Sequence, residues 1–229
     1  MATPAHLLPP DEAGRLHALR QFDVVAALRE PIFQGLVGLV ARIFQLPIVF
    51  ITTVGGEQVD FLATHGVPGL EVLPREQALC SLAIGQQHTV TLNHMLTAPT
   101  NLHQQTAQKL GLQAYAGAPI VLEQNYAVGV FCVSSTVPRE FSPDEVAVLE
   151  DLAGLVSHLV VVRQHLLTQE AAPQWEALQQ QAKDRLHELN GLLSYLSQRQ
   201  LLLVPTSAAL LQAVRQRLQK VCALLQDAV

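Results

Sequence analysis

The sequence lacks any long apolar run. A membrane-spanning helix needs about 18 or more consecutive apolar residues, and no segment of the chain reaches that length. Residues 1–10 carry neither a positively charged region nor a long apolar stretch, so they do not resemble a secretory signal peptide. We therefore expect a cytoplasmic protein with no membrane partner.

Charge is scarce, and positive charge is nowhere concentrated. Only 14% of the 229 residues are charged, and the formal net charge is −5. Proteins that bind nucleic acids usually present a clustered basic surface, so we expect no nucleic-acid partner. Hydrophobic residues make up 49% of the chain, which is enough to fold most of it around a buried core.

Cysteine is also scarce. Cys80, Cys132 and Cys222 are odd in number and far apart, so the chain has neither a disulfide framework nor a CxxC metal or redox motif. His88, His94 and His103 lie in or close to the polar stretch at 93–108, but the three histidines lack the paired spacing of a metal site. We predict no metal centre, and the pattern leaves any cofactor unknown.

The most regular pattern in the chain lies between residues 113 and 134. Two runs rich in β-branched and aromatic residues flank a polar break at 123–125, which is typical of an antiparallel hairpin. Neither run alternates strictly, so we expect both faces to be covered and the hairpin to lie centrally in a sheet. Gly117, Pro119 and Gly129 indicate a bulge or a close backbone approach.

The other elements follow from periodicity and turn residues. We expect helices from Asp11 and from Pro31, strands at 48–54 and 58–64, a loop at 65–75, a helix at 75–84, a strand at 88–92 and a polar stretch at 93–108. A long helix begins after Ser142, which caps it together with Glu145. Pro173 is expected to interrupt this helix. The result is an α+β domain that ends near residue 167.

Six stretches carry a family resemblance in their order and spacing: residues 15–20, 46–50, 75–84, 115–119, 129–133 and 138–142. On these, residues 12–166 resemble a GAF domain of the bacterial signalling type. The resemblance implies a central antiparallel sheet of five to six strands flanked by helices. It also implies a small-molecule pocket roofed by residues 80–112.

The positions expected to contact that ligand are Phe61, Cys80, Asn93, His94, Tyr115 and Cys132. Two common features of the family are altered. Asp60 replaces an aromatic residue before Phe61, and Asn93 replaces an aspartate. The ligand therefore stays unidentified.

Three special GAF activities can be compared with the residues. No signature of cyclic-nucleotide binding is recognisable. Bilin attachment uses a Cys followed directly by His, whereas Cys80 precedes Ser81 and His103 follows Leu102. Free-methionine sulfoxide reductases need pocket cysteines, because a second thiol resolves the sulfenic acid. Cys80 and Cys132 could approach one another, but their apolar surroundings favour inert packing.

Residues 168–229 are predicted to form a helical hairpin. Apolar residues recur at near-heptad spacing from Trp175 to Leu203, and a second stripe runs from Leu210 to Ala228. Residues 205–207 separate the two helices, with Thr206 or Ser207 as the cap. A lone hairpin buries one face of each helix, so two copies pairing as a four-helix bundle would complete the burial. We expect a homodimer.

The first helix of this hairpin contains residues 187–193, His-Glu-Leu-Asn-Gly-Leu-Leu. They resemble the H box of the histidine-kinase dimerisation and phosphotransfer hairpin. In this interpretation His187 is the phosphoacceptor and Glu188 assists it. Gly191 departs from the usual second Asn, and no ATP-binding domain follows, so a response regulator or a separate kinase would be the partner. Alternatively, His187 is a solvent-facing residue of a dimerisation helix.

Together these patterns predict a cytoplasmic bacterial signalling protein rather than an enzyme. Residues 1–11 are expected to be a flexible N-terminus, residues 12–167 a GAF sensor, and residues 168–229 the hairpin that dimerises and relays the signal. Two alternatives remain open. One is a histidine phosphotransfer protein using His187, and the other is a thiol-dependent reductase of the free-methionine sulfoxide type.

Overall fold

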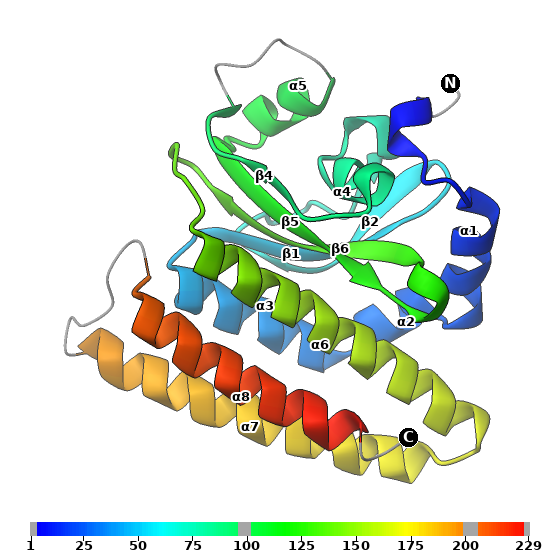
Figure 1. The fold of residues 1–229 in the computed structure, drawn as a ribbon, viewed down its shortest axis with the longest axis vertical. Helices are drawn as coiled ribbons and strands as arrows, with labels where there is room; N and C mark the ends of the chain where they lie inside the picture. The colour runs from blue at the N-terminus through cyan, green and yellow to red at the C-terminus, as the bar shows by residue number, and fades with distance from the viewer. Residues whose placement is uncertain (1–3, 96–101, 199–205, 227–229) are drawn as a thin grey trace.

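The structure, a computed structural model, describes residues 4–95, 102–198 and 206–226. Figure 1 shows its layers: a sheet, helices on both of its faces, and a helical hairpin outside one helical layer. In chain order the elements are η1 (Ala5–Leu7), α1 (Glu12–Gln21), α2 (Val24–Leu28), α3 (Pro31–Phe44), β1 (Ile48–Val54), β2 (Gln58–His65), β3 (Val72–Pro74), η2 (Arg75–Gln77), α4 (Cys80–Gln86), β4 (Val90–Leu92), α5 (Leu102–Lys109), β5 (Ala114–Val121), η4 (Glu123–Asn125), β6 (Ala127–Ser135), α6 (Pro143–Thr168), α7 (Ala172–Gln198) and α8 (Ala208–Gln226).

The sheet has six antiparallel strands in the order β3-β2-β1-β6-β5-β4. The predicted α+β class and the β5–β6 hairpin are therefore confirmed. Every residue of β6 is buried, as expected for a strand covered on both faces. A Cβ atom at Gly129 would lie 2.1 Å from the carbonyl oxygen of Thr52. Only glycine allows β1 and β6 to approach this closely.

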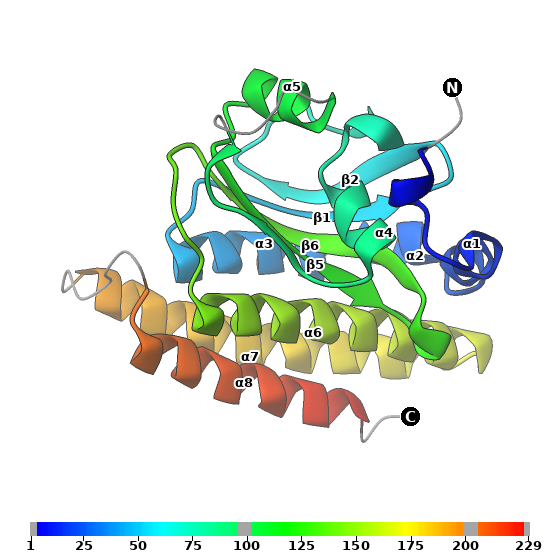
Figure 2. The same ribbon diagram turned by 45° about the horizontal axis from the view of Figure 1, so that its top comes forward.

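The chain between β2 and α4 differs from the sequence predictions in two places. Part of the loop expected at 65–75 forms the edge strand β3, which pairs with β2; Pro74 ends it, and an edge strand tolerates the missing N–H. The helix expected at 75–84 is divided into η2 and α4, because Ala78 between them has extended backbone angles. The roof predicted at 80–112 comprises α4 and α5, which lie over one face of the sheet (Figure 2). Residues 96–101 of that roof lie outside the described residues.

The start of α6 has the predicted capping box. Ser142 Oγ accepts a hydrogen bond from the Glu145 backbone N–H at 3.2 Å, and the Glu145 carboxylate accepts one from the Ser142 N–H at 2.9 Å. The helix α6 ends at Thr168 and α7 begins at Ala172. Pro173 lies in the first turn of α7, where its missing N–H is tolerated. The interruption predicted at Pro173 is confirmed.

The middle of α6 is buried more extensively than a single apolar stripe predicts. Val148, Leu155 and Val162 form a second buried row with seven-residue spacing, beside the row through Leu152 and Leu159. A helix that is apolar on several sides has to be covered on several sides. One side of α6 contacts β5 and β6, and the other contacts α7 and α8 (Figure 1).

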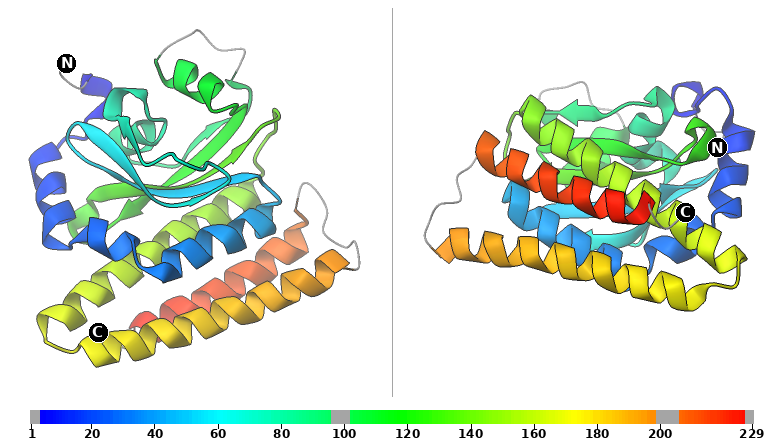
Figure 3. Two further views of the ribbon diagram at one scale, coloured as in Figure 1. Left: turned by 180° about the vertical axis from the view of Figure 1, so that it is seen from behind. Right: turned by 60° about the horizontal axis from the view of Figure 1, so that its bottom comes forward.

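The C-terminal hairpin packs on the rest of its own chain (Figure 3). Its buried leucines belong to the same hydrophobic cluster as α3, α6 and the inner face of the sheet. Polar contacts also fix it: Thr206 Oγ1 donates to the Ile43 carbonyl at 2.9 Å, and Arg215 Nε donates to Asp151 at 2.6 Å. The burial that motivated the homodimer is thus supplied within one chain. Dimerisation stays a prediction, without that support.

The predicted end of the first hairpin helix and residue 205 lie outside the described residues. Two residues are predicted as the cap of α8. Ser207 Oγ accepts a hydrogen bond from the Leu210 backbone N–H at 3.4 Å, whereas the Thr206 hydroxyl donates to the Ile43 carbonyl. Within the part of the chain that the structure covers, no helix has the length and apolar character needed to cross a bilayer.

Residues 4–11, expected to belong to a flexible N-terminus, pack against the domain. Leu7 in η1 is fully buried, and its carbonyl oxygen accepts a hydrogen bond from Arg75 at 2.8 Å. Asp11 caps α1 by accepting from the Gly14 backbone N–H at 2.8 Å. The N-terminal segment therefore forms part of the roof side of the molecule.

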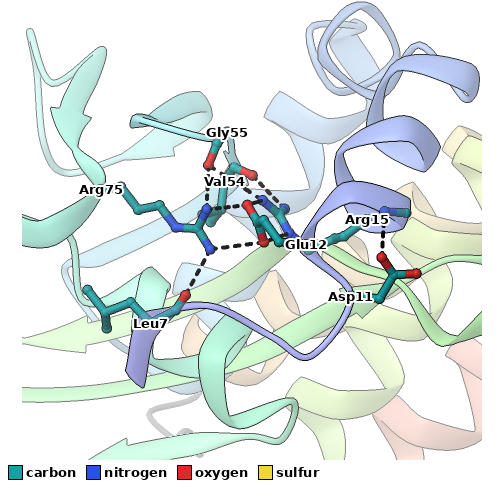
Figure 4. Close-up of polar contacts among 8 residues, drawn as sticks. Leu7, Asp11, Glu12, Arg15, Val54, Gly55 and Arg75 are labelled. Carbon is teal, nitrogen blue, oxygen red and sulfur yellow. Dashed lines mark hydrogen bonds and ion pairs between the residues drawn. The ribbon is translucent and has the colours of Figure 1, made fainter. Parts of the chain in front are cut away.

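A buried charge network joins α1, the β1–β2 turn and η2 (Figure 4). Arg15 and Arg75 are each only 1% exposed, and both bind the Glu12 carboxylate, at 2.7 and 2.5 Å. Arg15 also donates to the Val54 carbonyl at 2.6 Å, and Arg75 to the Gly55 carbonyl at 3.0 Å. Burial acts to raise the pKa of Glu12, but hydrogen bonds and charge attraction from the two arginines lower it overall.

We expect Glu12→Gln to lower the free energy of unfolding at pH 7 by roughly 3 kcal/mol, because it leaves two buried guanidinium groups without a carboxylate. The lowered pKa of Glu12 means that its stabilisation is present above the unfolded-state pKa of about 4.3 and is lost as pH falls through the folded-state value. The variant should therefore lose less stability on acidification. Urea titrations between pH 7 and pH 3 measure both effects. Glu176→Gln, at an exposed position of α7, is the control, and equal behaviour of the two variants would contradict the assignment.

Candidate functional site

A cluster of sulfur and hydroxyl groups lies on the sheet face beneath the roof. Cys80 opens α4, Tyr115 lies on β5 and Cys132 on β6. The Sγ atoms of Cys80 and Cys132 are 3.5 Å apart, and the Tyr115 hydroxyl is 3.2 Å from Cys132 Sγ. All three side chains are buried. The structure thus brings together three of the residues predicted to line the pocket.

Strand register explains how these groups meet. Cys132 pairs with Gly117 on β5 and with Phe50 on β1. Residues 115 and 117 face the same side of β5, because side chains alternate along a strand. A Cβ atom at Gly117 would lie 2.2 Å from the Tyr115 hydroxyl. The missing side chain at Gly117 therefore leaves the space in which the Tyr115 hydroxyl reaches Cys132.

The two thiols differ in acidity. Burial acts to raise the pKa of Cys80, but hydrogen bonds with Cys132, Thr52 and Tyr115 hold that pKa below its ordinary value. Burial, with the contribution of Cys80, raises the pKa of Cys132 well above the ordinary thiol value, and burial likewise raises that of Tyr115. The thiolate is the reactive form of cysteine. The lowered pKa favours the thiolate form at Cys80, so Cys80 is the candidate nucleophile and Cys132 the candidate resolving thiol.

Thr52 is a member of this cluster that the sequence pattern did not single out. It is fully buried in β1, among apolar residues. A signal was present, since Thr52 and Thr53 are the polar residues of the otherwise apolar run at 48–54. Buried hydroxyl groups need hydrogen-bond partners, so this pair already indicated a polar feature on each face of the strand.

The other predicted ligand positions are spread along the roof side. Phe61 packs edge-on against Phe50, with ring centroids 5.2 Å apart, in the same hydrophobic cluster as Cys80 and Tyr115. Asn93 is half-buried, and its Oδ1 atom has no hydrogen-bond partner among the described residues. His94 is exposed.

The remaining histidines of this region occupy different environments. His88 is exposed and its Nδ1 contacts the Thr89 carbonyl at 2.9 Å. His103 is buried on α5, and its Nε2 has no hydrogen-bond partner among the described residues. Burial lowers the pKa of His103, with a further contribution from the charge of His6. Over the described ranges, no three His, Cys, Asp or Glu side chains are grouped as a metal site requires.

The H-box-like segment lies on α7 where that helix meets α3. Its apolar positions Leu189 and Leu193 are buried in the core, whereas His187 and Glu188 are exposed. Glu188 forms an ion pair with Arg185 on the same helix, with Oε1 and Nη1 3.5 Å apart. The His187 ring is accessible, as a phosphoacceptor must be, but its phosphorylation stays a prediction. A Cβ atom at Gly191 would contact nothing within 4 Å, so packing does not require that glycine.

Comparison with known proteins agrees with the fold. Residues 28–160, more than half of the chain, match the family described as GAF domain. Among curated proteins, a cyclic di-GMP phosphodiesterase from Pseudomonas aeruginosa is 27% identical over 158 residues, which cover 68% of this chain. The matched region is 26% of that relative, so the chain spans about a quarter of its length.

Two solved structures share the fold at low sequence identity. The GAF domain region of a Geobacter sulfurreducens protein is 20% identical, with a TM-score of 0.50, over 61% of this chain and 95% of that one. The blue-light absorbing form of the Thermosynechococcus elongatus PixJ GAF domain is 17% identical, with a TM-score of 0.51, over 63% and 91%. The family match, the six-stranded antiparallel sheet and the helices on its two faces lead to one conclusion: this chain belongs to the GAF domain family.

Proposed function

We propose that this GAF protein is a signalling sensor in which a small molecule binds beneath α4 and α5 and the response passes through α6 to the α7–α8 hairpin. The observation that carries the proposal is the position of α6. It contacts β5 and β6, two of the strands that form the floor of the site, and it also contacts both hairpin helices. Close-packed cores transmit small displacements rather than absorbing them.

The ligand site is proposed from groups that lack hydrogen-bond partners among the described residues. Among the described residues, Asn93 Oδ1 and His103 Nε2 are buried without hydrogen bonds, and both belong to the roof segment. An unsatisfied buried polar atom costs free energy, so its presence in a folded protein calls for a partner. A small polar molecule that donates a hydrogen bond to Asn93 would supply one. The cyclic di-GMP phosphodiesterase relative is consistent with a signalling role.

Signal output is proposed to follow from a shift between two arrangements of the hairpin. A ligand moves such an equilibrium only if it binds one arrangement more tightly. The partners proposed for the output are a second copy of the chain, a response regulator or a separate kinase. His187, exposed on α7, remains the candidate phosphoacceptor for the last two.

Native mass spectrometry of gently purified protein tests the sensor proposal. We expect the wild-type chain to carry a small molecule, whose mass begins to identify it, and the same spectrum reports the number of subunits. Asn93→Ala and His103→Ala should lose the added mass, because each removes a proposed ligand contact. Gln105→Ala, at an exposed position of α5, should keep it. An empty wild-type chain, or equal retention by all three variants, would count against the proposed site.

The Cys80–Cys132 pair supports a second candidate function, thiol-dependent reduction of a methyl sulfoxide. Oxygen would pass from the sulfoxide to the Cys80 thiolate, releasing a thioether and leaving a sulfenic acid on Cys80. Attack by the Cys132 thiol would then form a disulfide and release water, and an external dithiol would reduce the disulfide. The two Sγ atoms are 3.5 Å apart, so Cys132 is already close enough to attack a sulfenic acid on Cys80.

A turnover assay with free methionine sulfoxide and dithiothreitol tests this second candidate. We expect methionine to form, and its rate to rise with pH and level off below the ordinary thiol pKa of about 8.5, because the pKa of Cys80 is lowered. Without dithiothreitol, intact-mass measurement should show the loss of two hydrogen atoms. Cys80→Ser and Cys132→Ser should abolish both signals, and Cys222→Ser should retain them. Wild-type turnover in the first two variants would exclude the mechanism.

A further inference from the structure

A groove of about 600 Å³ lies between α3 and α7, on the side of α3 away from the sheet. Its volume falls within the range of about 300–1,000 Å³ that is usual for small-molecule sites. The two helices run in the same direction, since Glu30 contacts Trp175 at one end and Arg42 contacts Asn190 near the other. The groove is lined by Pro31, Ile32, Gln34, Gly35, Gly38, Leu39, Arg42, Lys183, Leu186, His187 and Asn190.

The floor of this α3–α7 groove is apolar. Ile32, Leu39 and Leu186 are buried beneath it. Gly35 and Gly38 lie one helical turn apart on α3, and a Cβ atom at either would meet nothing within 4 Å. Each mid-helix glycine costs about 1 kcal/mol relative to alanine. Packing among the residues that the structure describes gives no reason for that cost, whereas the two glycines keep the groove open.

The polar groups of the α3–α7 groove are cationic or neutral, and none of the described residues that line it is Asp or Glu. Arg42 donates to the neutral oxygens of Asn190 and Ser194, and Lys183 Nζ donates to Gln179 Oε1 at 2.9 Å. Across the described part of the chain, neither cation pairs with a carboxylate, and the His187 ring has no hydrogen-bond partner. Half-buried cations without a counter-charge favour an anion.

We propose that the α3–α7 groove binds a small amphipathic anion, with an apolar body on the glycine-lined floor and one carboxylate or phosphate group beside Lys183 and His187. These two side chains lie one turn apart on α7 and present donors to a single head group. Arg42, already engaged by Asn190 and Ser194, adds positive charge at the far end. This site is separate from the one beneath α4 and α5, so it stands or falls independently of the sensor proposal.

Isothermal titration calorimetry on the full chain tests the proposal with four probes that share a ten-carbon chain and are kept below their micelle concentrations. Decanoate and decyl phosphate carry the two candidate head groups, and decanol and decyltrimethylammonium are their neutral and cationic counterparts. We expect one equivalent of at least one anion to bind, roughly tenfold or more tighter than decanol, as one favourable charge contact provides. The tighter anion identifies the head group. No anion binding, or equal binding of decanol, would overturn the proposal.

Variants locate the bound anion. Gly38→Leu should abolish binding, because its side chain fills the groove, while the helix gains propensity. Gly191→Leu is the matched control: it makes the same change on α7, outside the groove lining, and should bind like the wild type. Lys183→Gln should weaken the anions and leave decanol unchanged. If circular dichroism shows that Gly38→Leu is unstable, Gly35→Leu serves as a second variant whose side chain fills the groove. Unchanged binding in both blocked variants would place the anion elsewhere and refute the assignment.

Discussion

The burial of α6 on opposite sides is the constraint on which the rest of the structure depends. Its apolar residues form more than one row, so the sheet alone cannot cover them. The α7–α8 hairpin covers the outer rows and in return buries its own leucines, which unites both parts in one core. The GAF domain and the hairpin are consequently not independent units. Arg215 with Asp151, and Glu30 with Trp175 and Gln179, add polar contacts at the edge of that core.

The sheet separates two kinds of environment. Its inner face, against α3 and α6, belongs to a continuous apolar cluster. Its outer face carries the buried thiols of Cys80 and Cys132, together with the Tyr115 hydroxyl. The Glu12 network closes the roof side by tying the N-terminal segment to η2 and to the β1–β2 turn. The buried thiols and the Tyr115 hydroxyl therefore lie on the face where a small molecule is proposed to bind, and the opposite face packs against the helices.

The contact between α3 and α7 is looser than that between α6 and α8. Glycines on α3 leave a groove beside α7 that the described parts of the chain do not fill. The H-box-like segment lines this groove through His187 and Asn190. Its sequence therefore admits a third interpretation beside phosphotransfer and dimerisation, in which these polar residues serve helix docking and ligand recognition. Each interpretation uses a different property of the same helix face.

Much of the fold follows from the sequence by itself. Strands such as β6 and the cap of α6 at Ser142 are specified by local patterns, because β-branched and aromatic runs, capping residues and turn residues act over a few positions. The family resemblance predicted that Cys80, Tyr115 and Cys132 lie around one ligand pocket. Only the tertiary structure decided that the two sulfurs touch, that Arg15 and Arg75 share one carboxylate, and that the hairpin folds back on its own domain. These outcomes depend on strand register and on which apolar faces meet, and such contacts between distant residues leave no local signal in a single sequence.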